Sequence, residues 1–145
     1  MKTRQISVFI DNRPGRLASV AQVLKEEGID IRAISMADAP DFGIFRIVVE
    51  DTDRARAALK QRGFVTEVSD VIAVEVEDRP GGLADVLAVF AEHQLNVEYM
   101  YAFLTERSGK AIIFFRFEDT DRAVSALRAA GMPVICGERL WRSVR

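Results

Sequence analysis

The chain contains the same Pro-Gly loop twice, and this loop has the chemistry of an anion site. The two copies lie 66 residues apart and consist of Arg13, Pro14 and Gly15 and of Arg79, Pro80 and Gly81. Each stands between an alternating apolar segment and an amphipathic one. Backbone N–H groups at the start of a helix lack partners, and together with the helix dipole they bind anions such as a carboxylate. Glycine also lets a ligand approach the backbone closely.

A Pro-Gly before a helix has a second interpretation, which is a plain turn with proline preset at the first helical position. A single copy favours that interpretation. Two copies in the same order of elements favour a ligand site, and both interpretations stay open at this point.

A second repeat divides the chain into two halves. The segment that begins at Glu50-Asp51-Thr52-Asp53 returns at Glu118-Asp119-Thr120-Asp121 with an offset of 68, so the second copy carries a two-residue insertion. We predict domains at residues 1–69 and 70–145, joined by a short linker at Ser69-Asp70. A unit of about 70 residues is marginal alone, and pairing the halves would bury more surface.

Hydrophobic periodicity predicts the same order of elements in both halves. The first half has strands at residues 6–10, 29–34, 44–50 and 64–68, a helix at 17–24 that ends at Gly28, a turn at 40–43, and a helix between Asp51 and Gly63. The second half has strands at 72–76, 95–100, 111–118 and 134–141, a helix at 83–90, a turn at 106–110, and a helix between Asp119 and Gly131. This strand–helix–strand–strand–helix–strand order is the split βαβ pattern of ferredoxin-like folds, an α+β class with antiparallel sheets.

Composition argues against several functions. The net charge of −2 argues against a nucleic-acid or membrane-surface binder, and an RNA-binding sheet would need stacked aromatics with basic residues on its face. No apolar run approaches the ~20 residues that span a bilayer. No signal peptide precedes the first strand, so we expect a cytoplasmic protein.

We also expect no catalytic residues, no metal site and no cofactor. The only cysteine, Cys136, excludes cysteine-pair metal motifs and is expected to pack in the terminal strand. The only histidine, His93, has no counterpart in the other half and is expected to be a surface residue near a helix end. The sequence therefore indicates a binding protein and not an enzyme.

At the repeated loops the chain resembles a tandem pair of ACT domains, the small βαββαβ modules that sense amino acids and related metabolites. The resemblance extends from about Arg4 to Trp141. It rests on two copies of one pattern, Asn12-Arg13-Pro14-Gly15 and Leu17 with Gly28-Ile29-Asp30-Ile31, and Asp78-Arg79-Pro80-Gly81 and Leu83 with Gln94-Leu95-Asn96-Val97. It implies sheets that carry their helices on one face. Gln94 departs from the family's glycine, which leaves the end of its helix uncertain.

The resemblance further implies two composite ligand sites, either within the chain or in its dimer. One would join Asn12 and the backbone of residues 13–17, including Arg16 and Leu17, with Asn96. The other would join Asp78 and the backbone of residues 79–83, including Gly82 and Leu83, with Asp30.

The two sites are not expected to be chemically equal. Paired amides suit both the ammonium and the carboxylate of an amino acid, whereas paired acids disfavour a carboxylate. Arg13 and Arg79 either offset those acids or are solvated surface charges. Gly82 in place of Arg16 predicts a slimmer and more flexible second loop. We expect the site at Asn12 and Asn96 to bind better.

The predicted function is therefore non-catalytic regulation. The chain would bind a small amino acid and act in trans on an enzyme or regulator, or change its own assembly, and family habit favours a homodimer. The alternative is an interaction module that regulates a partner enzyme without a ligand. Four large side chains are either core residues or the lining of a pocket for an apolar or aromatic amino acid: Met36, Tyr99, Met100 and Phe103.

Overall fold

The structure is a computed structural model that describes residues 1–104 and 109–143. The chain forms two compact units. The first module is Arg4–Ser69, and the second is Asp70–Arg145 together with Met1–Thr3.

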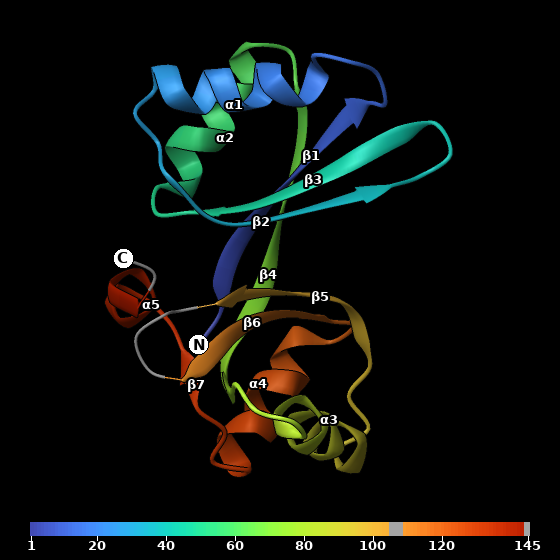
Figure 1. The fold of residues 1–145 in the computed structure, drawn as a ribbon, viewed down its shortest axis with the longest axis vertical. Coiled ribbons are helices and arrows are strands. Elements are labelled where there is room, and N and C mark those ends of the chain that lie inside the picture. Colours follow the sequence, from blue (N-terminus) through green and yellow to red (C-terminus); the bar gives the residue numbers. More distant parts are fainter. Residues whose placement is uncertain (105–108, 144–145) are drawn as a thin grey trace. The chain divides into compact units, whose positions relative to one another are not determined.

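The first module is an antiparallel sheet with two helices on one face (Figure 1). Its elements are β1 (Thr3–Asp11), α1 (Arg16–Glu26), β2 (Ile31–Asp38), β3 (Phe42–Val49), α2 (Thr52–Gln61) and the first part of β4 (Val65–Glu77). Strand β3 lies between β1 and β2 and pairs antiparallel with both. The inward side chains of β1 pack with those of α1 and α2, and this core includes Ile6, Val8, Val20, Leu24 and Leu59.

The second module repeats this arrangement and adds a helix at its end. Its elements are the rest of β4, α3 (Gly82–Glu92), β5 (Val97–Leu104), β6 (Lys110–Phe117), α4 (Thr120–Ala129), β7 (Val134–Ile135) and α5 (Glu138–Ser143). Strand β6 lies between β4 and β5, and β7 also pairs with β4. The Phe90 ring meets the rings of Phe115 and Phe117 edge-on, at centroid distances of 4.9 and 5.0 Å. The predicted fold class is confirmed. The predicted turn at 106–110 falls largely outside the described residues.

The second repeated segment has a structural role in both modules. Asp51 caps α2 by accepting a hydrogen bond from the Arg54 amide, and Asp119 caps α4 in the same way, as the sequence predicts. The arginine of each segment then reaches the carbonyl at the end of the preceding helix. Arg54 donates to the Glu27 oxygen at 2.6 Å, and Arg122 donates to the His93 oxygen at 3.1 Å. The segment therefore caps one helix and ties it to the end of the other.

The predicted strand at 134–141 is wrong beyond Ile135. Gly137 has a φ of 59°, a left-handed conformation that ends the extended segment, and the short helix α5 follows. The apolar residues after it are typical of a strand, but Leu140 is completely buried on one side of a helix. Cys136 is exposed between β7 and Gly137 and does not pack in a strand.

Two other expectations about strands are also corrected. Ser69 and Asp70 are not a linker, because β4 runs through both without a break and the Asp70 carbonyl accepts a hydrogen bond from Arg116 at 2.9 Å. Their low strand propensity is overridden by the flanking pairing residues. The alternating apolar residues at 6–10 are typical of a half-buried strand, but Gln5 and Ser7 of β1 are buried as well, and Gln5 donates to Ser7 at 3.4 Å.

Helices α1 and α3 end in the same geometry although only one of them ends in glycine. Gly28 has a φ of 66°, and Gln94 at the equivalent position has a φ of 54°. The same pair of hydrogen bonds closes each helix, from Gly28 and Ile29 in the first module and from Gln94 and Leu95 in the second. The departure at Gln94 therefore does not alter the helix end.

Replacing Gln94 with glycine should raise the free energy of unfolding by about 0.5–1 kcal/mol, because a side chain is strained in this conformation and glycine is not. The reciprocal change Gly28→Gln should lower it by a similar amount. Urea unfolding of both variants measures the two effects. An unchanged midpoint for both would show that neither backbone position is held left-handed.

Candidate functional site

Each Pro-Gly loop leads into a helix whose first turn has backbone amides without hydrogen-bond acceptors among the described residues. Gly15 and Gly81 have φ values of 86° and 87°, and neither helix has a side-chain cap. In the part of the chain that the structure describes, the amides of Leu17 and Ala18 donate no hydrogen bond, and neither do those of Leu83 and Ala84. Two orphan donors at each helix N-terminus suit an anion such as a carboxylate.

The two loop arginines pair within their own loops. Arg13 lies 3.1 Å from Asp11, and Arg79 lies 2.7 Å from Asp85 while also donating to the Pro80 carbonyl at 3.1 Å. Both guanidinium side chains are more than half exposed, at 64% and 55%. Exposed pairs of this kind add little stability and can exchange partners readily.

The two predicted contributors before the second strands are also engaged within their own modules. The Asn96 side chain donates to the Glu118 carboxylate at 3.5 Å, and the Asn96 backbone carbonyl accepts a hydrogen bond from the Glu118 backbone amide. Asp30 lies 3.1 Å from Arg32, whose side chain is only 12% exposed and also reaches Glu50 at 3.6 Å. Arg32 therefore offsets the charge of Asp30.

Sequence reasoning missed Arg32. The available signal was its position two residues after Asp30, at the start of the second strand. Asn12 and Asp78 lie exposed in their loops. Their pairings with Asn96 and Asp30 join residues of different modules and stay a prediction.

The expectation that Gly82 makes the second loop more flexible is wrong, because Gly82 is closely packed. It is the buried first residue of α3, and a Cβ placed there would lie 2.0 Å from the Glu77 carbonyl oxygen. Its counterpart Arg16 has room for a side chain and stacks its guanidinium over the Phe64 ring at 4.9 Å from the centroid. The Arg16 Nε lies 4.0 Å from Asp11 and makes no hydrogen bond.

Four of the predicted site residues line three separate pockets. Asn96 lines one of 250 Å³ with Arg122 and Glu118. Arg16 lines one of 530 Å³ in the first module, and Arg79 and Gly82 share one of 280 Å³ in the second.

The pocket beside Arg16 is cationic because its second charged residue is Arg62. Arg62 forms an ion pair with Glu26. Hydrogen bonds from Gln22 and from Arg62 hold the pKa of Glu26 below its ordinary value.

The four large side chains that the sequence assigns either to the core or to a ligand pocket lie at partly or fully exposed positions. Met36 and Met100 are 48% and 38% exposed, and Tyr99 and Phe103 are half-buried. None of them belongs to the buried core. His93 is half-buried, not fully on the surface, and its Nδ1 lies 2.9 Å from the Val89 carbonyl oxygen at the end of α3.

Two further searches cover the described residues only. Within residues 1–104 and 109–143, no three His, Cys, Asp or Glu side chains gather so that they could hold a metal ion. Over the same ranges, no helix has the length and apolar character needed to cross a membrane.

Comparison with known proteins identifies the family. The chain is similar to a Bacteroides thetaiotaomicron protein of known structure, with 32% identity, coverage of 98% of this chain and 97% of that one, and a TM-score of 0.90. It shares its fold with the regulatory subunit of aspartate kinase from Thermus thermophilus in its ligand-free form (24% identity, 88% and 90% coverage, TM-score 0.63). The same subunit from Thermus flavus gives 22% identity, 90% and 92% coverage, and a TM-score of 0.62. No curated protein matches the chain. A family model described as an ACT domain pair matches residues 1–141, and the chain therefore belongs to the ACT domain regulatory family.

Proposed function

We propose that this protein is a non-catalytic regulator that binds a small amino acid at its Pro-Gly loops. One observation carries the proposal: both loops hold the same left-handed glycine before a helix whose second and third amides donate no hydrogen bond within the described residues. A carboxylate bound there would accept hydrogen bonds that the helix does not use. Two loops that share this backbone geometry favour a ligand site over a plain turn.

The ammonium of the ligand requires an acceptor near the loop. Asn12 with Asn96 would provide amide oxygens, and the 3.5 Å contact from Asn96 to Glu118 is long enough to be given up readily. Asp78 with Asp30 would provide carboxylates, of which Asp30 is already offset by Arg32. The amide-lined site remains the better candidate.

Regulation in trans is part of the same proposal. The regulated activity would belong to a partner enzyme or regulator in the cytoplasm, and the regulator would act as a homodimer. Proteins of this fold that serve as regulatory subunits of aspartate kinase support the idea of such a partner.

A thermal-shift screen of the twenty amino acids tests the proposal. A ligand at 100 times its Kd should stabilise the folded protein by about 2.7 kcal/mol, which is a shift of several degrees. Asn12→Ala and Asn96→Ala should reduce the shift, while Gln22→Ala, on an exposed helix position, serves as the control. The absence of a shift with every amino acid would contradict the proposal.

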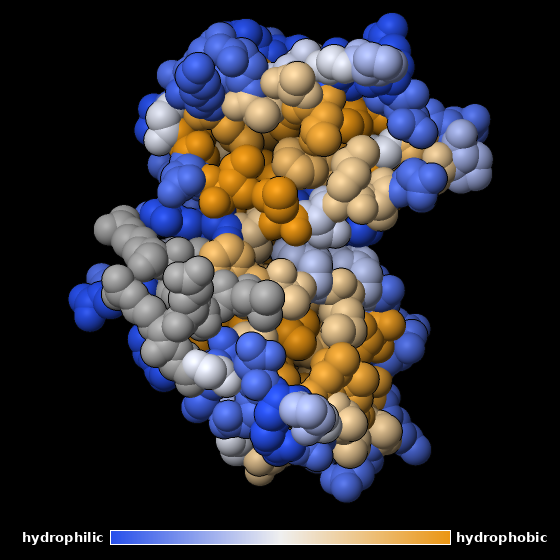
Figure 2. Space-filling model, viewed as in Figure 1, coloured by the Kyte–Doolittle hydropathy of each residue, from blue (hydrophilic) through white to orange (hydrophobic). Residues whose placement is uncertain are grey.

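A second candidate function is regulation by contact alone, with the loops as plain turns. The observation that favours it is exposed apolar surface on the strands at the sheet edges, where Ile34 is 57%, Met36 48% and Met100 38% exposed. Figure 2 shows apolar residues gathered on the visible face of each module. A partner captured equally with and without amino acids, and lost on Ile34→Asp, would favour this candidate.

A further inference from the structure

Each module has a groove between its first helix and the residues that follow its second helix. The two grooves are built at equivalent positions of the repeat. Arg16, Val23 and Phe64 line the first, and Gly82, Val89 and Met132 line the second. The grooves differ in their side chains and in how closely the first helix packs on the preceding strand, since Arg16 carries a side chain where Gly82 has no room for one.

In the second module the groove has an apolar floor. Five of the residues that line its 280 Å³ are Val76, Val86, Val89, Met132 and Pro133. Gly82 contributes no side chain and can accept none, because of its contact with the Glu77 carbonyl. The groove therefore has no side chain at the position that Arg16 occupies in the first module. Its volume is just below the ~300 Å³ at the lower end of small-molecule sites, so it suits a small ligand.

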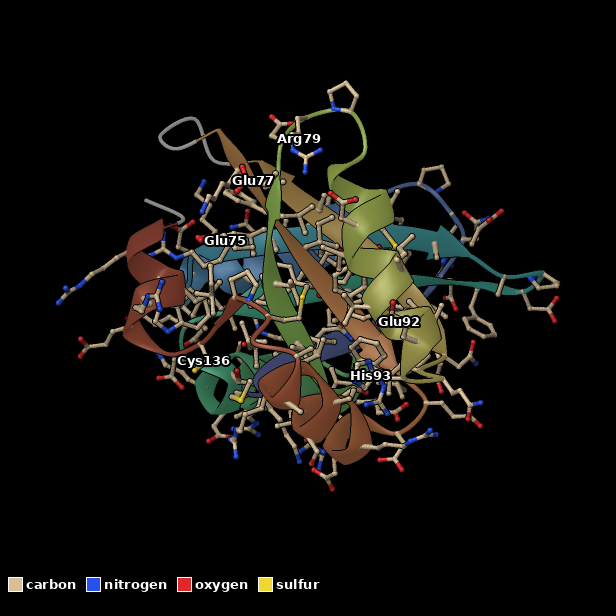
Figure 3. The ribbon with its side chains drawn as sticks, turned by 90° about the horizontal axis from the view of Figure 1, so that it is seen from below. Glu75, Glu77, Arg79, Glu92, His93 and Cys136 are labelled. Atoms are coloured by element: carbon tan, nitrogen blue, oxygen red, sulfur yellow. The ribbon has the colours of Figure 1, made fainter. Side chains whose placement is uncertain are left out.

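The rim of this groove carries charges of both signs. Arg79 pairs with Asp85 at 2.7 Å, and Lys110 pairs with Glu77 at 3.7 Å. Figure 3 shows Arg79 where the chain passes from β4 towards α3, with Glu77 and Glu75 farther along β4. These four side chains are 39–67% exposed, so the pairs can open without stranding a buried charge.

The first-module groove has different chemistry. The Arg16 guanidinium covers the Phe64 ring, and Arg62 adds a second positive charge to the lining, which contains no carboxylate among the described residues. An apolar ligand side chain in this groove would meet the Arg16 guanidinium and not the Phe64 ring. The two grooves therefore cannot prefer the same ligand side chain.

We infer that the second-module groove binds the aliphatic side chain of a small apolar amino acid, with the ligand's two charges at the rim. The carboxylate would face Arg79 or Lys110, and the ammonium would face Asp85 or Glu77. This inference rests on the proposed function and adds to it a second amino-acid site, in the second module and distinct from the site at Asn12 and Asn96, with a ligand class of its own. It places the side-chain pocket within a single module.

Calorimetric titration of the full chain with L-leucine as the probe tests the inference. L-Leucine should bind, whereas 4-methylpentanoate and 3-methylbutylamine, which each lack one charge, should bind at least tenfold more weakly. L-Lysine and L-glutamate should show no binding in this groove, because its floor would have to accept a charge. Binding confined to charged amino acids would overturn the inference.

A matched pair of variants locates the site. Val89→Arg places a long charged side chain in the second-module groove at a half-buried position, and it should weaken L-leucine binding at least tenfold. Gln22→Arg places the same charge beside the first-module groove and should leave the affinity within twofold of the wild type. Methyl NMR of the wild-type protein gives a readout that needs no variant: L-leucine should shift the methyl signals of Val86, Val89 and Met132.

The outcomes separate this inference from the proposed function. If L-leucine or another amino acid binds but is unaffected by Val89→Arg, and its methyl shifts lie elsewhere, the inference is wrong and the proposed function stands. If no amino acid binds the wild-type protein, the proposed function is wrong and the inference falls with it.

Discussion

Replacing Gly82 with alanine is expected to lower the free energy of unfolding by about 3 kcal/mol. The added Cβ would lie 2.0 Å from the Glu77 carbonyl oxygen and 3.1 Å from its carbon, and both are backbone atoms that no rotamer change can move. Alanine favours a helix over glycine by about 1 kcal/mol, which offsets only part of this clash. Helix α3 would have to move away from β4, and the change in urea unfolding midpoint measures the loss.

The equivalent substitution in the first module is the control. Arg16→Ala removes a stacking contact with Phe64 and adds no clash, so the loss should stay below about 1 kcal/mol. Equal effects of the two substitutions would contradict the close packing of α3 on β4.

Truncating Leu140 to alanine should cost about 2–4 kcal/mol, because its side chain is completely buried. Leu140 lies in α5, and it is absent from the cluster that α3 and α4 form with the sheet. The loss would therefore report on the anchoring of α5 and not on that cluster. Guanidinium unfolding followed by circular dichroism measures it.

Arg142 in the same helix provides the control. Its side chain is 82% exposed and its ion pair with Glu138 spans 3.5 Å, so Arg142→Ala should change stability by less than about 0.5 kcal/mol. If Leu140→Ala lowered the free energy of unfolding as little as Arg142→Ala, the conclusion that Leu140 anchors α5 would be contradicted.

The parts of the fold that follow from local chemistry could be predicted from the sequence. The caps at Asp51 and Asp119 depend on one side chain and an amide three residues on, and both are present. The alternation of Ile6, Val8 and Ile10 and the helical spacing of Val20 and Leu24 place these residues in one core. Family membership follows from the same residues in the same order.

The remaining features depend on contacts between distant residues. Leu140 and its neighbours have the apolar content of a strand, and only the left-handed Gly137 and the burial of one side of α5 distinguish a helix. In the sequence, Gly82 is typical of a flexible loop. Its lack of room for a side chain becomes evident only from its contact with the Glu77 backbone. The groove joins Val76, Val89 and Met132 from three elements, so no local pattern indicates it.

The most direct test of the central claim is equilibrium dialysis of the full-length protein against an equimolar mixture of the twenty amino acids, with mass-spectrometric quantification on both sides of the membrane. We expect one amino acid, or a few of related shape, to be enriched on the protein side at one or two molecules per chain. Enrichment should fall on adding Asn12→Ala and Asn96→Ala together. Equal concentrations of all twenty on both sides would contradict the account of this protein as an amino-acid-binding regulator.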